Sequence, residues 1–263
     1  MKPRCEHLRI DREEQVLWIT IDRADCRNAL SLQTWAELRE VAAWVAEQPV
    51  RAVVVTGAGE EAFVSGADIR EFPAARADAR QAEEYDQVSH AALAALAHLD
   101  QPVVAMINGL CFGGGVALAL ACDIRFAAAH ARFCVPAVRL GLSYPLEVGI
   151  APLVHTVGPT AAADILLSGR VIDATEAASL RLVTRVVPST ELRQETRAYV
   201  ARLAEGAPLT LAAHKAAIRS LMTAVPEATV AVREKIRRCF ASEDYREGVE
   251  AFLQKRKPIF RGR

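Results

Sequence analysis

The fold is decided by residues 101–127, which read QPVVAMINGLCFGGGVALALACDIRFA. Residues 102–107 form a short apolar run, typical of a strand buried on both faces, and 108–109 (Asn-Gly) is a turn signal. Three glycines then open the apolar segment 116–121, which predicts a helix, and 123–127 predicts another strand. A strand, a crossover helix and a strand in succession indicate a βαβ unit. We therefore predict an α/β fold with a largely parallel sheet.

The same alternation extends towards the N-terminus. A hairpin at 12–15 is expected to join the first two strands. Ser31 directly precedes apolar residues at helical spacing, and a serine in that place is a typical helix N-cap. The expected elements are strands at 8–10, 16–21 and 51–56 and helices at 32–45 and 80–99.

Helical patterns dominate the C-terminal third, where 182–187 is the one clear strand signal. No break in composition separates this part from the rest. We therefore divide the chain into an α/β core at 1–195 and a helical region at 196–263 that belongs to the same unit. The expected helices are 159–167, 190–205, 209–222, 227–240 and 243–255.

Charge and hydropathy exclude several classes of function. The 263 residues include 32 basic and 32 acidic side chains, so the formal net charge is zero. Nucleic acid binding usually requires a basic excess, and we expect no nucleic acid partner. No apolar run reaches the length that spans a bilayer, and the charged stretch 1–11 does not have the pattern of a signal peptide. We expect no membrane partner.

The cysteines indicate a reducing, cytoplasmic location. They are scattered singly, without a C-x-x-C pair and without a histidine at ligand spacing, so neither disulfides nor a metal site is expected. We interpret them as mostly buried thiols. They are Cys5, Cys26, Cys111, Cys122, Cys134 and Cys239.

Two glycine-bearing loops are the candidate site. The first, 57–71, and the second, 108–115, each follow an apolar strand, and open α/β sheets bind ligands at the carboxyl ends of their strands. Each loop offers backbone N–H donors at the start of a helix, where the dipole favours negative charge. Together they predict a pocket with two donors for a developing oxyanion. The alternative is that the glycines only turn the chain.

These motifs resemble the enoyl-CoA hydratase/isomerase (crotonase) superfamily. The resemblance rests on FVSGADIRE at 63–71, NGLCFGGG at 108–115 and CDI at 122–124, supported by RADCRNAL at 23–30 and SGR at 168–170. It covers about 15–263. It implies a spiral of ββα units with a helical C-terminal trimerisation region, assembled as a homotrimer or homohexamer.

The resemblance also implies a site. The N–H groups of Ala67 and Gly114 would form an oxyanion hole for the carbonyl of an acyl-CoA thioester, which is the substrate, so no separate cofactor is expected. Phe252 and Lys255 match family positions that often serve a neighbouring subunit. The implied CoA-binding residues are Arg27, Ala29, Asp68, Ile69, Pro136, Leu140, Phe252 and Lys255.

This chain departs from the hydratases of the superfamily at two positions. Their two glutamates correspond here to Ala117 and Ala137. Hydration needs one group that activates water and one that protonates the α-carbon, and alanine does neither. Ordinary hydration through that pair is therefore not expected.

The segment 139–150 suggests what replaces the glutamates. Its Gly-x-x-Tyr spacing and the following Val-Gly-Ile resemble the methylmalonyl-CoA decarboxylase branch, in which a tyrosine at the position of Tyr144 lies beside the reacting carbon. That branch has a histidine where this chain has Ala67. Tyr144 is otherwise a shape-filling aromatic whose hydroxyl reaches solvent or a backbone carbonyl. Glu147 is either a relocated acid/base or a first-turn acid that favours the helix dipole.

Two hypotheses from different classes follow. The first is an acyl-CoA enzyme that stabilises a thioester enolate, by hydration or isomerisation in the family manner or by a glutamate-independent reaction such as decarboxylation. The second is a catalytically silent acyl-CoA-binding protein that has kept the fold. A nucleotide-binding protein is disfavoured, because the chain has no G-x-G-x-x-G and no G-K-[ST] loop.

Overall fold

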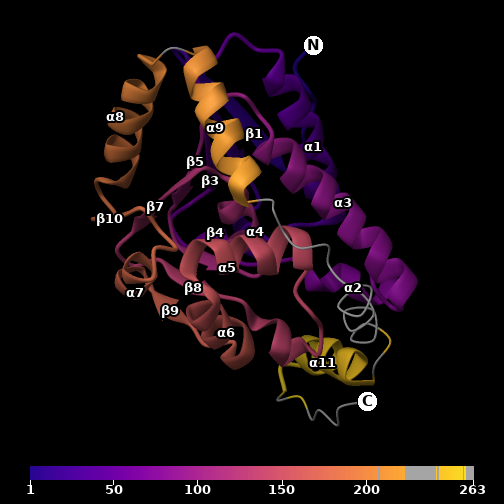
Figure 1. Cartoon of the computed structure of the whole chain (residues 1–263). Coiled ribbons are helices and arrows are strands. Elements are labelled where there is room, and N and C mark those ends of the chain that lie inside the picture. The colour runs from indigo at the N-terminus through magenta and orange to yellow at the C-terminus, as the bar shows by residue number, and fades with distance from the viewer. Residues whose placement is uncertain (207, 223–240, 242, 257, 259–263) are drawn as a thin grey trace.

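The structure is a computed structural model that describes residues 1–206, 208–222, 241, 243–256 and 258. Figure 1 shows the N-terminus at one end of the molecule and the last described helix, α11 (Glu243–Leu253), at the other. Between them lie two sheets, with long helices along the outside. The predicted helix at 227–240 lies outside the described residues.

Six strands form the larger sheet, in the order β1-β2-β3-β5-β7-β10. The first two are antiparallel and form the predicted hairpin, whereas every other neighbouring pair is parallel. The βαβ prediction is therefore confirmed. The strands are β1 (Leu8–Glu13), β2 (Val16–Ile21), β3 (Ala52–Gly57), β5 (Val103–Ile107), β7 (Ile124–Ala128) and β10 (Arg185–Val187).

A second sheet of four short strands was not predicted. Its order is β4-β6-β8-β9, parallel except for the last pair. After each of β3, β5 and β7 the chain adds one strand to this sheet, and the first two such pairs continue into helices. This repeat is the expected spiral of ββα units. The strands are β4 (Ala62–Val64), β6 (Leu110–Phe112), β8 (Arg132–Cys134) and β9 (Ile172–Asp173).

The helices agree with the expected ones wherever the pattern is long. Ser31 caps the first of them, since its hydroxyl accepts a hydrogen bond from the N–H of Thr34 at 3.1 Å. The helices are α1 (Leu32–Ala46), α2 (Phe72–Ala75), α3 (Ala79–Ala97), α4 (Gly114–Ala121), α5 (Ala151–Val157), α6 (Pro159–Ser168), α7 (Ala174–Ser179), α8 (Leu192–Ala204), α9 (Pro208–Met222) and α11.

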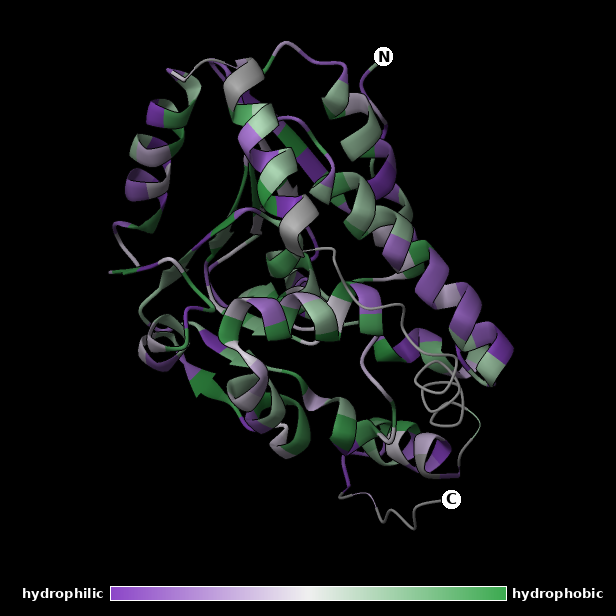
Figure 2. Cartoon of the chain, in the orientation of Figure 1, coloured by the Kyte–Doolittle hydropathy of each residue, from purple (hydrophilic) through white to green (hydrophobic). Residues whose placement is uncertain are grey.

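Helices cover both faces of the larger sheet, which explains why its central strands read as continuous apolar runs. Val53 and Val55 of β3 belong to a large core cluster that includes α1, α3 and α4. Val54, between them, faces the other way into a cluster with Leu192 and Val200 of α8. In Figure 2, α8 carries hydrophilic residues on the side turned away from the sheet.

The helix α9 is tied to the core by a partly buried ion cluster. Lys215 Nζ lies 2.8 Å from Asp123 Oδ2, and Arg219 Nη2 lies 3.1 Å from Asp123 Oδ1. Asp123 directly precedes β7 and also accepts a hydrogen bond from the N–H of Val103. In the described part of the chain, no helix combines the length and the apolar character needed to cross a membrane.

Candidate active site

The first loop presents the N–H of Ala67 to the interior through a single parallel bridge with Leu30. Leu30 donates its N–H to the Gly66 carbonyl at 2.8 Å, and the Leu30 carbonyl accepts from Asp68 N–H at 2.9 Å. In a parallel ladder the residue between these two partners points its own N–H and C=O to the opposite side. The N–H of Ala67 is therefore left for another acceptor.

The second loop brings the N–H of Gly114 beside it. Gly114 is the first residue of α4, where an amide has no partner within the helix. A Cβ built on Gly114 would lie 3.8 Å from the nitrogen of Ala67, so the two amides are neighbours. Among the residues that the structure describes, neither N–H donates a hydrogen bond. The predicted pair of amides is thus brought together.

The closeness of α4 and β4 depends on glycine. A Cβ at Gly115 would lie 2.6 Å from the carbonyl oxygen of Val64, closer than such atoms approach. Any larger residue would push the start of α4 away from β4. The glycines of the second loop therefore serve the approach of two backbone segments and not only the turn.

Both amides line a cavity that we call the inner cavity; together with the space that opens to solvent, its empty volume is about 800 Å³. Ala117, Ala137 and Tyr144 line it as well. The two alanines are 5% and 8% exposed, so glutamates at these positions would point into the interior. In their absence the wall around the two amides is mostly apolar.

Tyr144 is 7% exposed, and its hydroxyl donates a 2.7 Å hydrogen bond to the carbonyl of Gly113. Burial strongly raises the pKa of this phenol, so it stays protonated at neutral pH. Gly149 makes room for the ring, because a Cβ there would lie 2.6 Å from it. The hydroxyl thus reaches a backbone carbonyl while the side chain lines the inner cavity, and a role of Tyr144 beside the reacting carbon stays a prediction.

Glu147 does not belong to the inner cavity. It lies on the one-turn π-helical segment Leu146–Ile150 and lines a neighbouring cavity together with His98, His155 and Arg219. Val148, the next residue, lies on the wall between the two cavities. The structure thus places Glu147 in the first turn of this segment and outside the inner cavity, and its role as a relocated acid/base stays a prediction.

The inner cavity has one ion pair that the sequence did not reveal. Arg76 Nη2 donates to Asp86 Oδ1 at 2.9 Å, and these two are the only charged residues lining the cavity in the described part of the chain. The guanidinium lies over the rings of Phe72 and Tyr85, at 5.0 and 4.6 Å from their centres. Burial raises the pKa of Asp86, while Arg76 acts in the opposite direction.

A second space, the outer cavity, adjoins the inner one and shares Ala67, Ile69, Pro136 and Leu140 with it. Every residue expected to bind CoA lines this outer cavity: Arg27, Ala29, Asp68, Ile69, Pro136, Leu140, Phe252 and Lys255. Phe252 and Lys255 reach it from the same chain. Its other cationic side chains are Arg70, Arg139 and Arg256.

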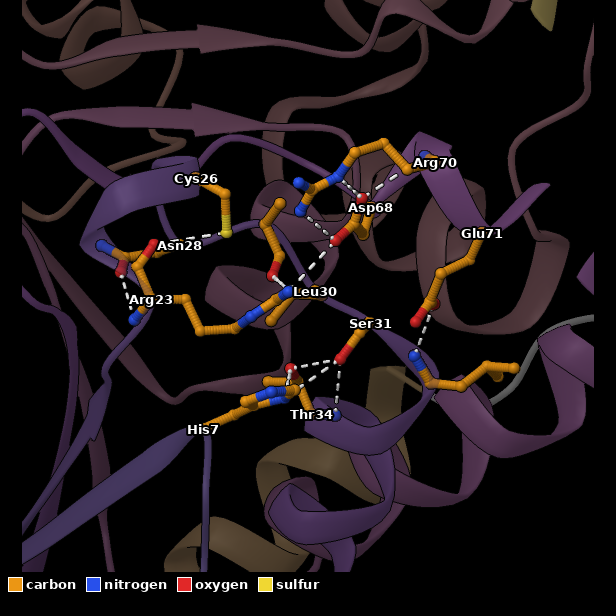
Figure 3. A network of polar contacts seen from close by, with 12 residues as sticks. His7, Arg23, Cys26, Asn28, Leu30, Ser31, Thr34, Asp68, Arg70 and Glu71 are labelled. Carbon is orange, nitrogen blue, oxygen red and sulfur yellow. Dashed lines mark hydrogen bonds and ion pairs between the residues drawn. The ribbon is translucent and has the colours of Figure 1, made fainter.

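Asp68 is a structural centre of the first loop (Figure 3). Its carboxylate accepts hydrogen bonds from Arg70 at 2.7 and 2.8 Å and from Arg23 at 3.1 Å. The Arg70 and Arg23 guanidinium groups lower the pKa of Asp68 to about 2. Asp68 also accepts from the N–H of Arg70, as the cap of the short turn Ile69–Glu71.

The segment before α1, which faces Asp68, is also held in place by polar contacts. In Figure 3, Glu71 reaches back to the start of α1, where Oε2 accepts from the N–H of Leu32 at 2.9 Å. Asn28, fully buried, donates its amide to the carbonyls of Ala58 and Ala62. These contacts fix the segment before α1 against the Ala67 loop, so the amide of Ala67 is presented by a rigid frame.

The sequence model of the enoyl-CoA hydratase/isomerase family matches residues 11–263. The chain belongs to this family. The matched residues contain the entire lining of both cavities. In the described residues, no group of three or more His, Cys, Asp or Glu side chains is placed to hold an ion.

Individual family members resemble the chain over its whole length. It is 34% identical to a crotonyl-CoA hydratase of Syntrophomonas wolfei, over 97% of this chain and 98% of that protein. An enoyl-CoA hydratase/carnithine racemase from Magnetospirillum magneticum has a TM-score of 0.82 and 39% identity, covering 99% of this chain and 97% of that one. A methylmalonyl-CoA decarboxylase bound to 2-nitronate-propionyl-CoA has a TM-score of 0.91 and 26% identity, covering 99% and 100%.

Proposed function

We propose that the chain binds an acyl-CoA thioester and stabilises its enolate between the N–H groups of Ala67 and Gly114. The observation that carries this proposal is the pair of adjacent amides, without a hydrogen-bond acceptor among the described residues, in the wall of an apolar cavity. An enolate next to a thioester places negative charge on the carbonyl oxygen. Donors already aimed at that oxygen stabilise it without reorganisation, each by about 3 to 4 kcal/mol.

The two cavities divide the substrate between them. The acyl group occupies the inner cavity, and the CoA arm follows the outer one past Ile69 and Leu140. Lys255 and Arg256 of the C-terminal segment supply positive charge towards the phosphates. The thioester then lies where the cavities meet, next to Ala67.

The reaction we propose is glutamate-independent, with decarboxylation of a 2-carboxyacyl-CoA as the first candidate. The bond between the α-carbon and the carboxylate breaks, CO₂ leaves, and the electron pair stays as the enolate, which then takes a proton. No base is needed to start, which suits a wall with Ala117 and Ala137. The likeness to the methylmalonyl-CoA decarboxylase supports this choice.

A second candidate, isomerisation of an enoyl-CoA, is favoured by Asp86. It is the one carboxylate that lines the inner cavity in the described residues, and burial raises its pKa towards the range useful for proton transfer. One such group is enough to move a proton from one carbon to another. In this scheme Arg76 holds the carboxylate in place.

The test is to incubate the protein separately with methylmalonyl-CoA, crotonyl-CoA and a 3-enoyl-CoA and to identify products by mass spectrometry. Decarboxylation predicts propionyl-CoA from the first, and isomerisation predicts a 2-enoyl product from the last that Asp86→Asn abolishes. Tight binding of the thioesters with no turnover would establish the catalytically silent binding protein instead. Absence of both binding and turnover would contradict the proposal.

The oxyanion hole itself is tested by a matched pair at residue 114. Gly114→Pro removes the N–H at the first position of α4, where proline suits a helix, and we expect kcat to fall by about 10²- to 10³-fold. Gly114→Ala keeps the N–H, and its Cβ meets Trp35 at 3.4 Å. The alanine variant is expected to retain most of the activity. Equal losses in the two variants would point to crowding and not to the lost donor.

A further inference from the structure

The peptide bond between Gly113 and Gly114 links Tyr144 to the inner cavity. Its C=O belongs to Gly113 and accepts a hydrogen bond from Tyr144, whereas its N–H belongs to Gly114 and faces the inner cavity. The bond is trans, so the two groups are the opposite ends of one dipole. A donor at the oxygen therefore acts directly on the N–H.

The Gly113 oxygen receives three donors. The N–H groups of Val116 and Ala117 approach it at 2.9 and 3.3 Å as the first hydrogen bonds of α4, and the Tyr144 hydroxyl approaches at 2.7 Å. The side-chain hydroxyl is thus the shortest of the three contacts. It comes from a segment remote in sequence and is independent of the helix.

This peptide needs such support because both of its residues are glycines. Gly113 has φ +47° and ψ −112° and makes no side-chain cap for α4. Without side chains, little local steric hindrance opposes rotation of the peptide plane. The hydrogen bond from Gly113 N–H to the Cys134 carbonyl holds one side of the residue, and Tyr144 holds the other.

We propose that Tyr144 is a positioning residue for the oxyanion hole: its hydroxyl orients and polarises the Gly113–Gly114 peptide, so that the N–H of Gly114 becomes a stronger donor to the thioester oxygen. The inference rests on the proposed function. Hydrogen bonds in a chain strengthen one another by about 10–30%. The hydroxyl proton is directed at the Gly113 oxygen, and in this arrangement Tyr144 does not itself transfer a proton to the substrate.

Two features of the surroundings suit this role. The phenol is buried, and burial keeps it protonated and able to donate over the whole useful pH range. Gly149 leaves space for the ring, since a Cβ there would meet it at 2.6 Å. The Tyr144 ring therefore packs closely against Gly149 and has little freedom to turn its hydroxyl away from Gly113.

The experiment measures the thioester carbonyl directly. The wild type and Tyr144→Phe are saturated with [1-¹³C]butyryl-CoA, which has no double bond to hydrate, and the carbonyl stretch is recorded by isotope-edited infrared spectroscopy. Binding to the wild type is expected to lower the frequency relative to free thioester. In Tyr144→Phe we expect part of that shift to be lost, kcat to fall about 2- to 8-fold and the Kd for CoA to stay unchanged.

A graded series makes the test independent of any loss of folding. Fluorinated tyrosines at residue 144 are stronger donors with nearly the same shape, and we expect them to lower the carbonyl frequency further than tyrosine does. A ring that only fills space would give no such trend. Tyr199→Phe removes a hydroxyl on α8, away from both cavities, and is expected to change nothing.

The outcomes separate this inference from the proposed function. A wild type that binds butyryl-CoA without any carbonyl shift has no oxyanion hole, and the proposed function fails. A full shift retained in Tyr144→Phe, together with full activity, overturns only the positioning role. A full shift with abolished turnover would instead make Tyr144 a proton donor and would also overturn it.

Discussion

Asp68 shows at the residue scale how a side chain that lines the outer cavity can act mainly on the fold. Its charge-assisted hydrogen bonds with Arg70 and Arg23 favour the ionised carboxylate and lower its pKa from 3.8 to about 2. The ionised form is thus stabilised in the folded state only. Asp68 therefore contributes stability above about pH 4, and this contribution is lost as the pH falls through about 2.

We expect Asp68→Asn to lower the free energy of unfolding at pH 7 by about 1 to 2 kcal/mol, less than the whole pKa shift implies because solvent screens the exposed Arg70. Denaturant titrations between pH 7 and pH 2 measure it. The difference in the free energy of unfolding between wild type and variant should decrease below pH 4. Asp164→Asn, which removes a carboxylate from an exposed pair with Arg170, serves as control and should cost less. A gap that stays constant with pH would contradict the assignment.

Ala117 and Ala137 belong to the same scale, because the resemblance aligns them with the two glutamates of the family's hydratases. We expect the double variant Ala117→Glu, Ala137→Glu to gain hydration of crotonyl-CoA, followed as loss of the enoyl absorbance. It should also be less stable by about 1 to 3 kcal/mol or more, since two carboxyls become buried. The matched Gln/Gln variant should share the instability without the gain. If the Glu/Glu variant hydrates crotonyl-CoA no faster than the Gln/Gln variant, carboxylates at these positions do not suffice for hydration.

At the element scale, α9 is the clearest case of a helix attached by charge. Lys215, whose side chain is 7% exposed, reaches Asp123 at the start of β7, and Arg219 reaches the same carboxylate one turn later. Burial lowers the pKa of Lys215, and Asp123 opposes that shift. The ion cluster therefore depends on Asp123 as its common acceptor.

Asp123→Ala should cost about 3 kcal/mol in the free energy of unfolding, because it leaves the buried ammonium without its carboxylate. Urea unfolding measures it. The control, Glu84→Ala, removes an exposed ion pair with Arg80 on α3 and should cost no more than about 0.5 kcal/mol. Similar costs for the two variants would show that the α9 cluster adds nothing beyond a surface pair.

The elements also show which helices and strands can be predicted from a local sequence pattern. The long helices α1, α3 and α8 and the strands β2, β3 and β5 each carry a pattern that local propensity and burial both support, and all were predicted. The strands of the second sheet have two or three residues, too few for any periodicity. Their pairing depends on partners some twenty to fifty residues away, which a local pattern does not contain.

For the whole molecule, the convergence of the Ala67 and Gly114 loops could be predicted because parallel strands place their carboxyl ends at one edge. The ion pair of Arg76 and Asp86 could not. Both side chains belong to the helical segment between β4 and β5. They reach the inner cavity only because this segment packs over the sheet. The direction of Glu147 depended likewise on a single π-helical turn.

The assembly of the molecule remains a proposal, and we propose a homotrimer or homohexamer. Several large apolar side chains of the single chain are exposed, among them Leu167 (77%), Ile218 (59%) and Phe252 (54%), and subunit contacts would cover such residues. Light scattering should give three or six times the 28.5 kDa mass of the chain. A mass equal to one chain would contradict the proposal.

The position of α11 has a practical consequence for handling this protein. Lys255, Arg256 and Pro258 border the outer cavity, so a peptide fused directly behind Pro258 would start beside the mouth of this cavity. The N-terminus lies at the far end of the molecule (Figure 1). Affinity tags, fluorescent fusions and surface anchors are therefore best attached at the N-terminal end, where they leave the mouth of the outer cavity unobstructed.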